Sequence, residues 1–405
     1  MLFFVVLILV LGGLVIAVRF HRTEPLIEPE PPELTAKRTS PDNAYYALDK
    51  LAQTLPDTPK PQRVKPGPIA AHMSIRREDN DPEMMEYLRV TRPSAENLVQ
   101  ILEEKAYYCA PVESIKNTRK DLILFRNLFA ILRGHALFAE KNDESEKAIE
   151  FVLAALRLGT AMAKDGPLEN VNSGTTAVAQ ASDTAMCLPW EDYSEERLRE
   201  FLKALDEVQP ANINLSRSLD WEFRLVEAGL YDDEEKEDTG GLRASVREAV
   251  VRRFLRKHEA ELRALANLSY PEKENWLDRH RRLRHTERTV LPTRIASSLM
   301  SGVSGVAAAA TQVEALRAAV ALEQYKKIHG EYPESLDALT PEFLDTVPMD
   351  AYSMEPLRYS RKQDSYQLYS VDRDGDNDGG DPKRDALYPP AIAATFKASL
   401  KNPVE

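Results

Sequence analysis

The stretch that decides the fold class is residues 122–163, LILFRNLFAILRGHALFAEKNDESEKAIEFVLAALRLGTAMA. Apolar side chains recur every three or four residues on both sides of Asn142-Asp143, which is the spacing of one buried face of an α-helix. The two polar residues interrupt that pattern and favour a turn. We therefore expect helices over 122–140 and 146–163, joined into an antiparallel hairpin.

Helical periodicity extends over the region around this hairpin. Ser94 is a good N-cap for a helix over 95–108. The sequence predicts a mainly α protein with a helical domain at 91–290. A helical bundle is the favoured arrangement, and tetratricopeptide-like hairpins are a weaker alternative because no repeat of about 34 residues is visible. Further helices are expected over 171–186, 194–207, 213–230, 241–268 and 272–288.

Length, charge and cysteine content limit the class of protein. A chain of 405 residues is long enough for two or three domains, and its net charge of −12 argues against nucleic acid as the main partner. Cys109 and Cys187 are too few for a disulfide framework or a cysteine-based zinc site. They are either two buried free thiols or one disulfide formed in an oxidising compartment.

An uncharged apolar run, LFFVVLILVLGGLVIAV, occupies residues 2–18. Its seventeen residues are close to the lower limit for crossing a bilayer, which takes roughly 20. We expect an uncleaved transmembrane helix within an anchor at 1–22, so that residues 2–18 contact the membrane. A cleaved signal peptide is the alternative, but such a peptide usually has basic residues before its apolar run, and only Met1 stands there.

The anchor is followed by a proline-rich linker at 23–90. Ten of the 26 prolines lie between Pro25 and Pro68, which predicts an extended, stiff spacer interrupted by a short helix over 43–55. Arg19 and Arg22, just after the apolar run, favour a body on the cytoplasmic side by the positive-inside rule.

Sequence motifs of common enzymes are absent. The chain has no His-Glu-x-x-His, no Gly-x-Ser-x-Gly, no phosphate-binding glycine loop and no dinucleotide fingerprint. A basic segment at 243–288 includes Arg252, Arg253 and Arg256. It is read as the solvated face of a long helix, with contact to anionic lipid headgroups as the alternative.

The segment 291–390 has a different pattern. A long helix is expected over 294–329, with a buried stripe at Ala315, Ala318, Leu322 and Tyr325 and with Gly330 as its C-cap. Thr340-Pro341 is expected to open a short helix. Residues 356–359 and 366–371 predict two strands of a hairpin that turns at 361–364, and residues 391–405 form a C-terminal tail.

An ordered series of apolar, aromatic and proline residues runs through this segment. Its members are Leu322, Tyr325, Gly330, Tyr332, Pro333, Leu336, Leu339, Leu344, Val347, Pro348, Asp350, Pro356, Leu357, Tyr359, Tyr366, Leu368, Tyr369 and Ser370. The series resembles the globular domain of the major pseudopilin of type II secretion (protein G) over about 310–385. The resemblance implies an α+β domain in which a long helix packs on a small antiparallel sheet, with a calcium-binding loop after the last strand.

Two departures from the pseudopilin pattern limit what the resemblance implies. The family usually has Asp-Pro, an aromatic residue and Gly where this chain has Asp350-Ala351-Tyr352-Ser353, so that loop is expected to differ in shape. The prepilin leader and the Gly-Phe-Thr-Leu sequence are also missing. We therefore expect a related domain on a different anchor, and not a pilin that is processed and polymerised.

The residues after the second strand independently indicate a metal site. Six aspartates occupy the fourteen positions 372–385, interspersed with glycines. Calcium needs six to eight oxygen ligands on a flexible loop, and closely spaced carboxylates supply them. A solvated acidic loop is the alternative, but so many carboxylates repel one another without a counter-ion. The expected calcium ligands are Asp372, Asp374, Asp376, Asp378, Asp381 and Asp385.

These features predict a non-enzymatic, membrane-anchored envelope protein. Its helical body would be a binding scaffold, and its calcium-stabilised pseudopilin-like domain would contact a protein partner whose identity the sequence does not indicate. A weak calcium site suits a calcium-rich compartment, so an extracytoplasmic body is favoured over the orientation that Arg19 and Arg22 indicate. The alternatives are an enzyme with an unrecognised site in the helical body and a cytoplasm-facing membrane scaffold.

Overall fold

The computed structural model describes residues 32–56, 82–105, 107–111, 115–227, 255–273 and 291–389, together with 393, 394 and 397. The anchor expected at 2–18 lies outside these residues, as do half of the proline-rich linker at 23–90 and much of the basic segment 243–288. Two of the described helices, Asp121–Lys141 and Ser297–His329, are long and apolar enough to cross a membrane. Both have at least half of that segment buried inside the protein, as core helices do.

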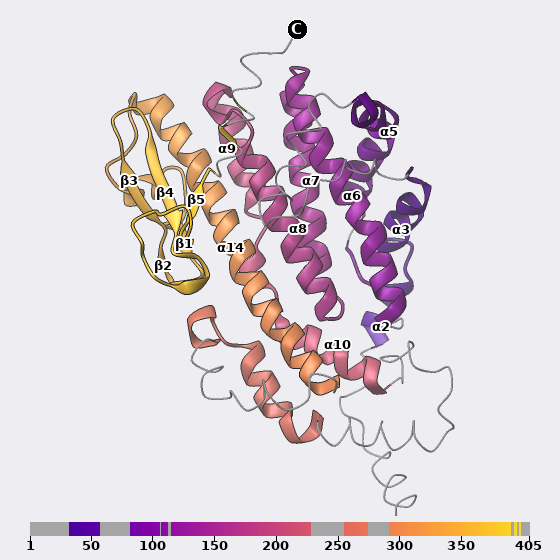
Figure 1. Cartoon of the computed structure of the whole chain (residues 1–405). Coiled ribbons are helices and arrows are strands. Elements are labelled where there is room, and N and C mark those ends of the chain that lie inside the picture. Colours follow the sequence, from indigo (N-terminus) through magenta and orange to yellow (C-terminus); the bar gives the residue numbers. More distant parts are fainter. Residues whose placement is uncertain are drawn as a thin grey trace, which may run out of the picture.

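The centre of the molecule is the expected hairpin with one more helix added. Helix α6 (Ile115–Lys141) and helix α7 (Ser145–Lys164) are joined by a turn in which Asp143 has a φ of 59°. Helix α8 (Leu168–Met186) follows after a short connection, and Figure 1 shows the three helices side by side. Phe125 and Leu132 of α6 and Phe151 of α7 are fully buried. The helical bundle is therefore confirmed over the described residues.

Helices α7 and α8 approach each other closely at two glycines. A Cβ at Gly174 would lie 2.5 Å from the carbonyl oxygen of Gly159 and 2.6 Å from the backbone nitrogen of Ala163. A Cβ at Gly159 would lie 2.9 Å from the carbonyl oxygen of Gly174. Only residues without a side chain allow the two backbones to be this close. The sequence at these positions thus fixes the spacing of the two helices.

Helix α14 (Leu291–His329) is the long helix expected at 294–329, and it ends at Gly330, which has a φ of 81°. It runs diagonally across the molecule and packs on α8, α9 (Glu195–Leu205) and α10 (Leu215–Glu227) (Figure 1). In the predicted stripe, Ala315, Ala318 and Leu322 are fully buried, while Tyr325 is only partly buried and packs against the same core.

The strands lie on the side of α14 that faces away from the bundle (Figure 1). The predicted hairpin is β3 (Arg358–Arg361) and β4 (Tyr366–Ser370), paired antiparallel with Arg358 opposite Tyr369. A third strand, β5 (Ala386–Tyr388), adds to the free edge of β4, and a separate short pair is formed by β1 (Met349–Asp350) and β2 (Glu355–Pro356). The small antiparallel sheet is confirmed, while β1, β2 and β5 had not been predicted.

Three local predictions were wrong. Ser94 is not an N-cap, because helix α5 (Pro82–Glu104) begins twelve residues earlier and contains Pro93. Packing of Met84, Tyr87 and Leu88 in the core stabilises this first half of the helix despite the proline.

Two predictions about short segments were also wrong. Residues 32–39 form helix α2 (Pro32–Thr39) instead of an extended spacer; Pro32 stands at its first position, where a missing N–H costs nothing. The short helix expected after Thr340 does not form: residues 341–343 make a turn, and the 3-10 helix η3 (Leu336–Leu339) lies before Thr340. Thr340 is extended there because a residue that precedes proline avoids the helical conformation.

Other predictions in the helical body hold. Helix α3 (Ala44–Thr54) begins after Asn43, whose side chain accepts a hydrogen bond from the backbone of Tyr45. Residues 255–266 are helical, within the helix expected at 241–268, and residues 270–273 are helical and overlap the start of the helix expected at 272–288. Cys109 and Cys187 are both free and buried, as the first of the two interpretations held.

One hydrophobic cluster joins the bundle and the sheet. Its buried members include Phe151 of α7, Leu322 of α14 and Leu368 of β4. Helix α14 contributes buried residues to its contacts with the bundle and with the sheet. The C-terminal segment and the bundle therefore share one hydrophobic core. The acidic loop is connected at both of its ends to strands of this sheet.

Candidate metal centre and a cavity in the helical body

The acidic residues 372–385 form the connection between β4 and β5. The connection begins with a 3-10 turn (Asp372–Asp374) and includes left-handed backbone at Asp372, Gly375, Gly379 and Gly380. Three of these positions are glycines, which adopt such angles without strain. The loop therefore turns back on itself several times above the edge of the sheet.

Asp385 is the best-buried carboxylate of the loop, at 5% exposure. Its Oδ2 accepts hydrogen bonds from the backbone nitrogens of Gly380 (2.7 Å) and Asp381 (3.1 Å). Its Oδ1 is buried and has no hydrogen-bond partner in the described part of the chain. A buried carboxylate oxygen left in this state costs free energy that a cation or a further donor would offset.

Asp378 is in a similar state. Its Oδ1 forms an ion pair with Arg384 at 3.0 Å, while its Oδ2 is buried without a hydrogen-bond partner among the residues that the structure describes. Asp378 and Asp385 therefore each offer one unused oxygen within the same loop. Oxygen ligands of this kind are what calcium binds.

The other four predicted ligands are placed differently. Asp374 and Asp381 are exposed and accept hydrogen bonds from the backbone nitrogens of Asp376 and Lys383, two residues on. Asp376 is exposed as well. Asp372 is half-buried at the start of the loop. Burial raises the pKa of its carboxyl group above the ordinary value, and the positive charge of Arg373 only partly opposes this shift.

The six aspartates do not form a preformed metal site. Within the described ranges, no three His, Cys, Asp or Glu side chains gather closely enough to hold a metal ion. The unused oxygens of Asp378 and Asp385 fit calcium in their chemistry. Binding would require the exposed carboxylates of the loop to move toward these two.

Two polar side chains that organise the loop were missed by sequence reasoning. Asp350 is buried, and its carboxylate accepts hydrogen bonds from the backbone nitrogens of Tyr352 (2.9 Å) and Val371 (3.0 Å). Asn377 accepts from Gly379 and from the hydroxyl of Tyr369. Only the pseudopilin resemblance had drawn attention to Asp350, since a lone aspartate carries no signal that it will be buried.

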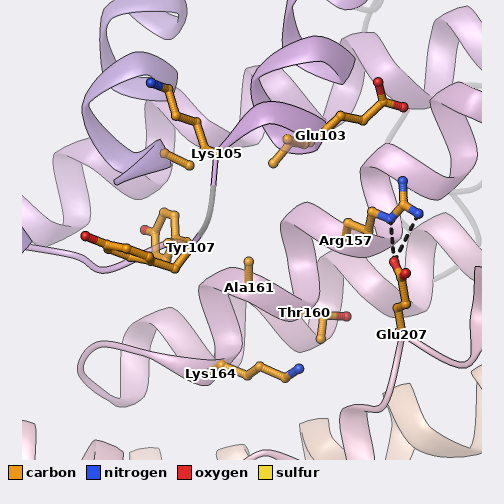
Figure 2. Close-up of a pocket in the computed structure, with 11 residues that line it drawn as sticks. Glu103, Lys105, Tyr107, Arg157, Thr160, Ala161, Lys164 and Glu207 are labelled. Atoms are coloured by element: carbon orange, nitrogen blue, oxygen red, sulfur yellow. Dashed lines mark hydrogen bonds and ion pairs between the residues drawn. The ribbon is translucent and has the colours of Figure 1, made fainter. Parts of the chain in front are cut away.

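The helical body contains an open cavity of about 620 Å³ between α7 and the end of α5 (Figure 2). Two carboxylates line it, but they do not converge. Glu207, in the turn after α9, pairs with Arg157 at 3.0 Å, and Figure 2 shows the carboxylate of Glu103 pointing away from the cavity. No pair of catalytic acids is therefore formed here by the residues described, and this cavity does not support the enzyme hypothesis.

Comparison of the chain with protein-family models, curated proteins and solved structures gave no match.

Proposed function

We propose that this chain is a non-enzymatic, membrane-anchored envelope protein whose pseudopilin-like C-terminal segment is stabilised by calcium and contacts another protein. The unused oxygens of Asp378 and Asp385 are the single observation that carries the proposal. They lie in a loop at the outer side of the molecule, on a sheet fixed to α14 (Figure 1). Calcium bound there would hold the loop in one shape for recognition.

The calcium site is tested by thermal unfolding of the full-length protein in detergent. Calcium at a hundred times its dissociation constant should stabilise the protein by about 2.7 kcal/mol. The double variant Asp378→Asn/Asp385→Asn should lose this effect, since each asparagine keeps an acceptor oxygen and replaces the other by an amide nitrogen. Asp345→Asn/Asp364→Asn is the matched control, because both of these aspartates are exposed and lie outside the loop.

Two results would contradict the calcium site. One is an equal melting temperature with calcium, with magnesium and with a chelator in the unaltered protein. The other is a calcium effect that the loop variant retains in full. In either case the loop would be a solvated acidic segment, and the contact with a partner would have to be explained without a metal.

The partner contact is tested by photo-crosslinking in cells. A photoreactive amino acid at Lys362, in the exposed turn between β3 and β4, should give a crosslinked adduct that the loop variant loses. The same amino acid at Lys203, an exposed position on α9, should give none. Equal adducts from both positions, or none from either, would show that the sheet is not the contact surface.

An extracytoplasmic body is part of the proposal, because a weak calcium site suits a calcium-rich compartment. Protease added to intact cells and to spheroplasts tests the orientation. Digestion of the body only after the outer barrier is opened supports a periplasmic location, and digestion in intact cells supports the cell surface. Protection in both preparations would favour the cytoplasm-facing scaffold instead.

A further inference from the structure

The cavity in Figure 2 is too large to be a packing defect. Its volume of about 620 Å³ lies within the roughly 300–1,000 Å³ of small-molecule sites, whereas voids in protein cores rarely exceed a water molecule. The cavity exists because α5 ends at Glu104 and the chain then runs past α3, where Asn43 and Tyr107 form an isolated β-bridge. Within the part of the chain that the structure describes, this face of α7 has no covering helix.

That face of α7 carries polar groups at helical spacing. Arg157, Thr160 and Lys164 all line the cavity, and in Figure 2 the guanidinium, the hydroxyl and the ammonium lie on the same side of the helix. Arg157 already has a carboxylate partner in Glu207, at 3.0 Å. Lys164 has no hydrogen bond or ion pair with any residue that the structure describes, although it stands at the cavity rim.

Thr160 supplies an independent observation. It is 3% exposed, and its hydroxyl has no hydrogen-bond partner within the described part of the chain. A buried hydroxyl without a partner costs about 1–3 kcal/mol. The hydroxyl oxygen is closed to solvent in this conformation, so an acceptor oxygen of a bound molecule would remove this cost only after the hydroxyl turns toward the cavity. Lys164, one turn further along α7, would balance the charge of an anionic acceptor.

The remaining wall is apolar and aromatic. Leu102, Ala161 and the rings of Tyr107 and Tyr108 line it, and Ala161 points into the open space (Figure 2). A cationic ligand is not favoured, because Glu207 is engaged by Arg157 and the carboxylate of Glu103 points outward. The lining therefore favours a molecule with one acidic end and one apolar end.

We propose that this cavity binds a small organic anion, with its acid group at Thr160 and Lys164 and its aromatic or aliphatic body against Ala161, Leu102 and the tyrosines. This function is independent of the calcium loop, since the cavity and the loop share no residue. It gives the helical body a ligand of defined chemistry and requires no catalytic step.

A pair of probes that differ only in charge tests the proposal. Saturation-transfer difference NMR of 3-phenylpropionate and of its neutral amide is measured with the full-length protein in detergent, with empty micelles as the blank. The acid should bind saturably at one site per chain and more tightly than the amide. Lys164→Gln should weaken the binding of the acid by up to about fivefold, the upper value for an exposed charge pair, and leave the binding of the amide unchanged.

Ala161→Trp should fill the cavity and weaken the binding of both probes at least about tenfold. Ala161 is partly exposed, so a larger side chain at this position extends into open space. Lys203→Gln, an exposed lysine on α9, is the charge-matched control and should change nothing. Far-UV circular dichroism checks that each variant is folded. No saturable binding of the acid, binding that Ala161→Trp leaves intact, or an equal effect of Lys164→Gln on acid and amide would overturn the assignment.

Discussion

Single buried side chains in the central helices have consequences that can be measured. His135 of α6 is fully buried, contacts the hydroxyl of Thr91 at 3.1 Å and lies beside the ring of Phe151. Burial, together with the positive charge of Arg92, lowers the pKa of its imidazole to about 4. The native protein therefore holds this histidine neutral at physiological pH.

We predict that stability falls on acidification because of His135. Between pH 6.5, the ordinary pKa of histidine, and about 4, the unfolded chain binds a proton here that the native state does not. The unfolding free energy should therefore decrease as the pH falls through this range, by about 3 kcal/mol in total, since one pKa unit corresponds to about 1.4 kcal/mol. Urea unfolding of His135→Gln should show a shallower pH dependence. If His135→Gln left the slope of the unfolding free energy against pH unchanged, other titratable groups would be the cause of the pH dependence.

Gly174 is a second residue whose role depends on its exact surroundings. We predict that Gly174→Ala lowers the unfolding free energy by about 1–3 kcal/mol, the usual cost of overpacking, because the new Cβ would meet backbone atoms of α7. Ser173→Ala, on the partly exposed side of the same helix, is the control and should be neutral or slightly stabilising. Both are measured by chemical denaturation. Equal stability of the two variants would show that α7 and α8 can move apart at no cost.

Among the elements, α2 is joined to the body through a buried arginine, in addition to contacts of Lys37 with Tyr107. Arg38 donates a hydrogen bond to Asp165 at 2.9 Å and stacks on the ring of Trp221, 4.1 Å from its centroid. Asp165 also pairs with Arg217 at 2.8 Å, so this buried carboxylate joins α2, the α7–α8 connection and α10. Cys109 lies near Asp165 and Arg38, and burial raises the pKa of its thiol to about 12.

We predict that Arg38→Met lowers the unfolding free energy by about 3 kcal/mol, because it removes one partner from a buried ion pair. The loss should be local enough to speed the reaction of Cys109 with a thiol reagent, measured in a Cys187→Ala background. Lys50→Met, at an exposed position on α3, is the control and should change neither quantity. An unaltered rate of thiol modification would mean that α2 stays in place without this pair.

At the scale of the whole molecule, α14 joins the helical bundle and the C-terminal sheet in one hydrophobic core. Leu368 of β4 is fully buried in the same cluster as residues of α7 and α8. We predict a single unfolding transition in which the sheet and the bundle melt together. Leu368→Ala should lower the unfolding free energy by about 2–5 kcal/mol and shift the fluorescence transition of the buried tryptophans Trp190 and Trp221 by the same amount.

The control for this prediction is Lys362→Ala, in the exposed turn of the hairpin, which should leave the transition unchanged. Two separate transitions, with the tryptophan signal indifferent to Leu368→Ala, would contradict a shared core. The sheet would then be an independent domain that only rests on α14.

Much of the fold could be read from local sequence. The hairpin at 122–163, the long helix ending at Gly330 and the β3–β4 hairpin all follow from hydrophobic spacing and terminating residues, which act within a few positions of the chain. The same local rules failed at Ser94 and at Thr340, where packing or a following proline set the boundary. The acidic loop could be recognised as a candidate because its aspartates are adjacent in sequence.

The sequence by itself determined the mainly helical class, the order of the principal elements and the chemical type of the candidate metal ligands. The tertiary structure alone decided that one carboxylate oxygen each of Asp378 and Asp385 in the acidic loop has no hydrogen-bond partner among the described residues, and that a cavity lies beside α7 at Thr160. The physical reason is that periodicity and composition act locally along the chain. Burial, hydrogen-bond satisfaction and open space depend on segments far apart in sequence, such as Arg157 with Glu207 and α14 with β4.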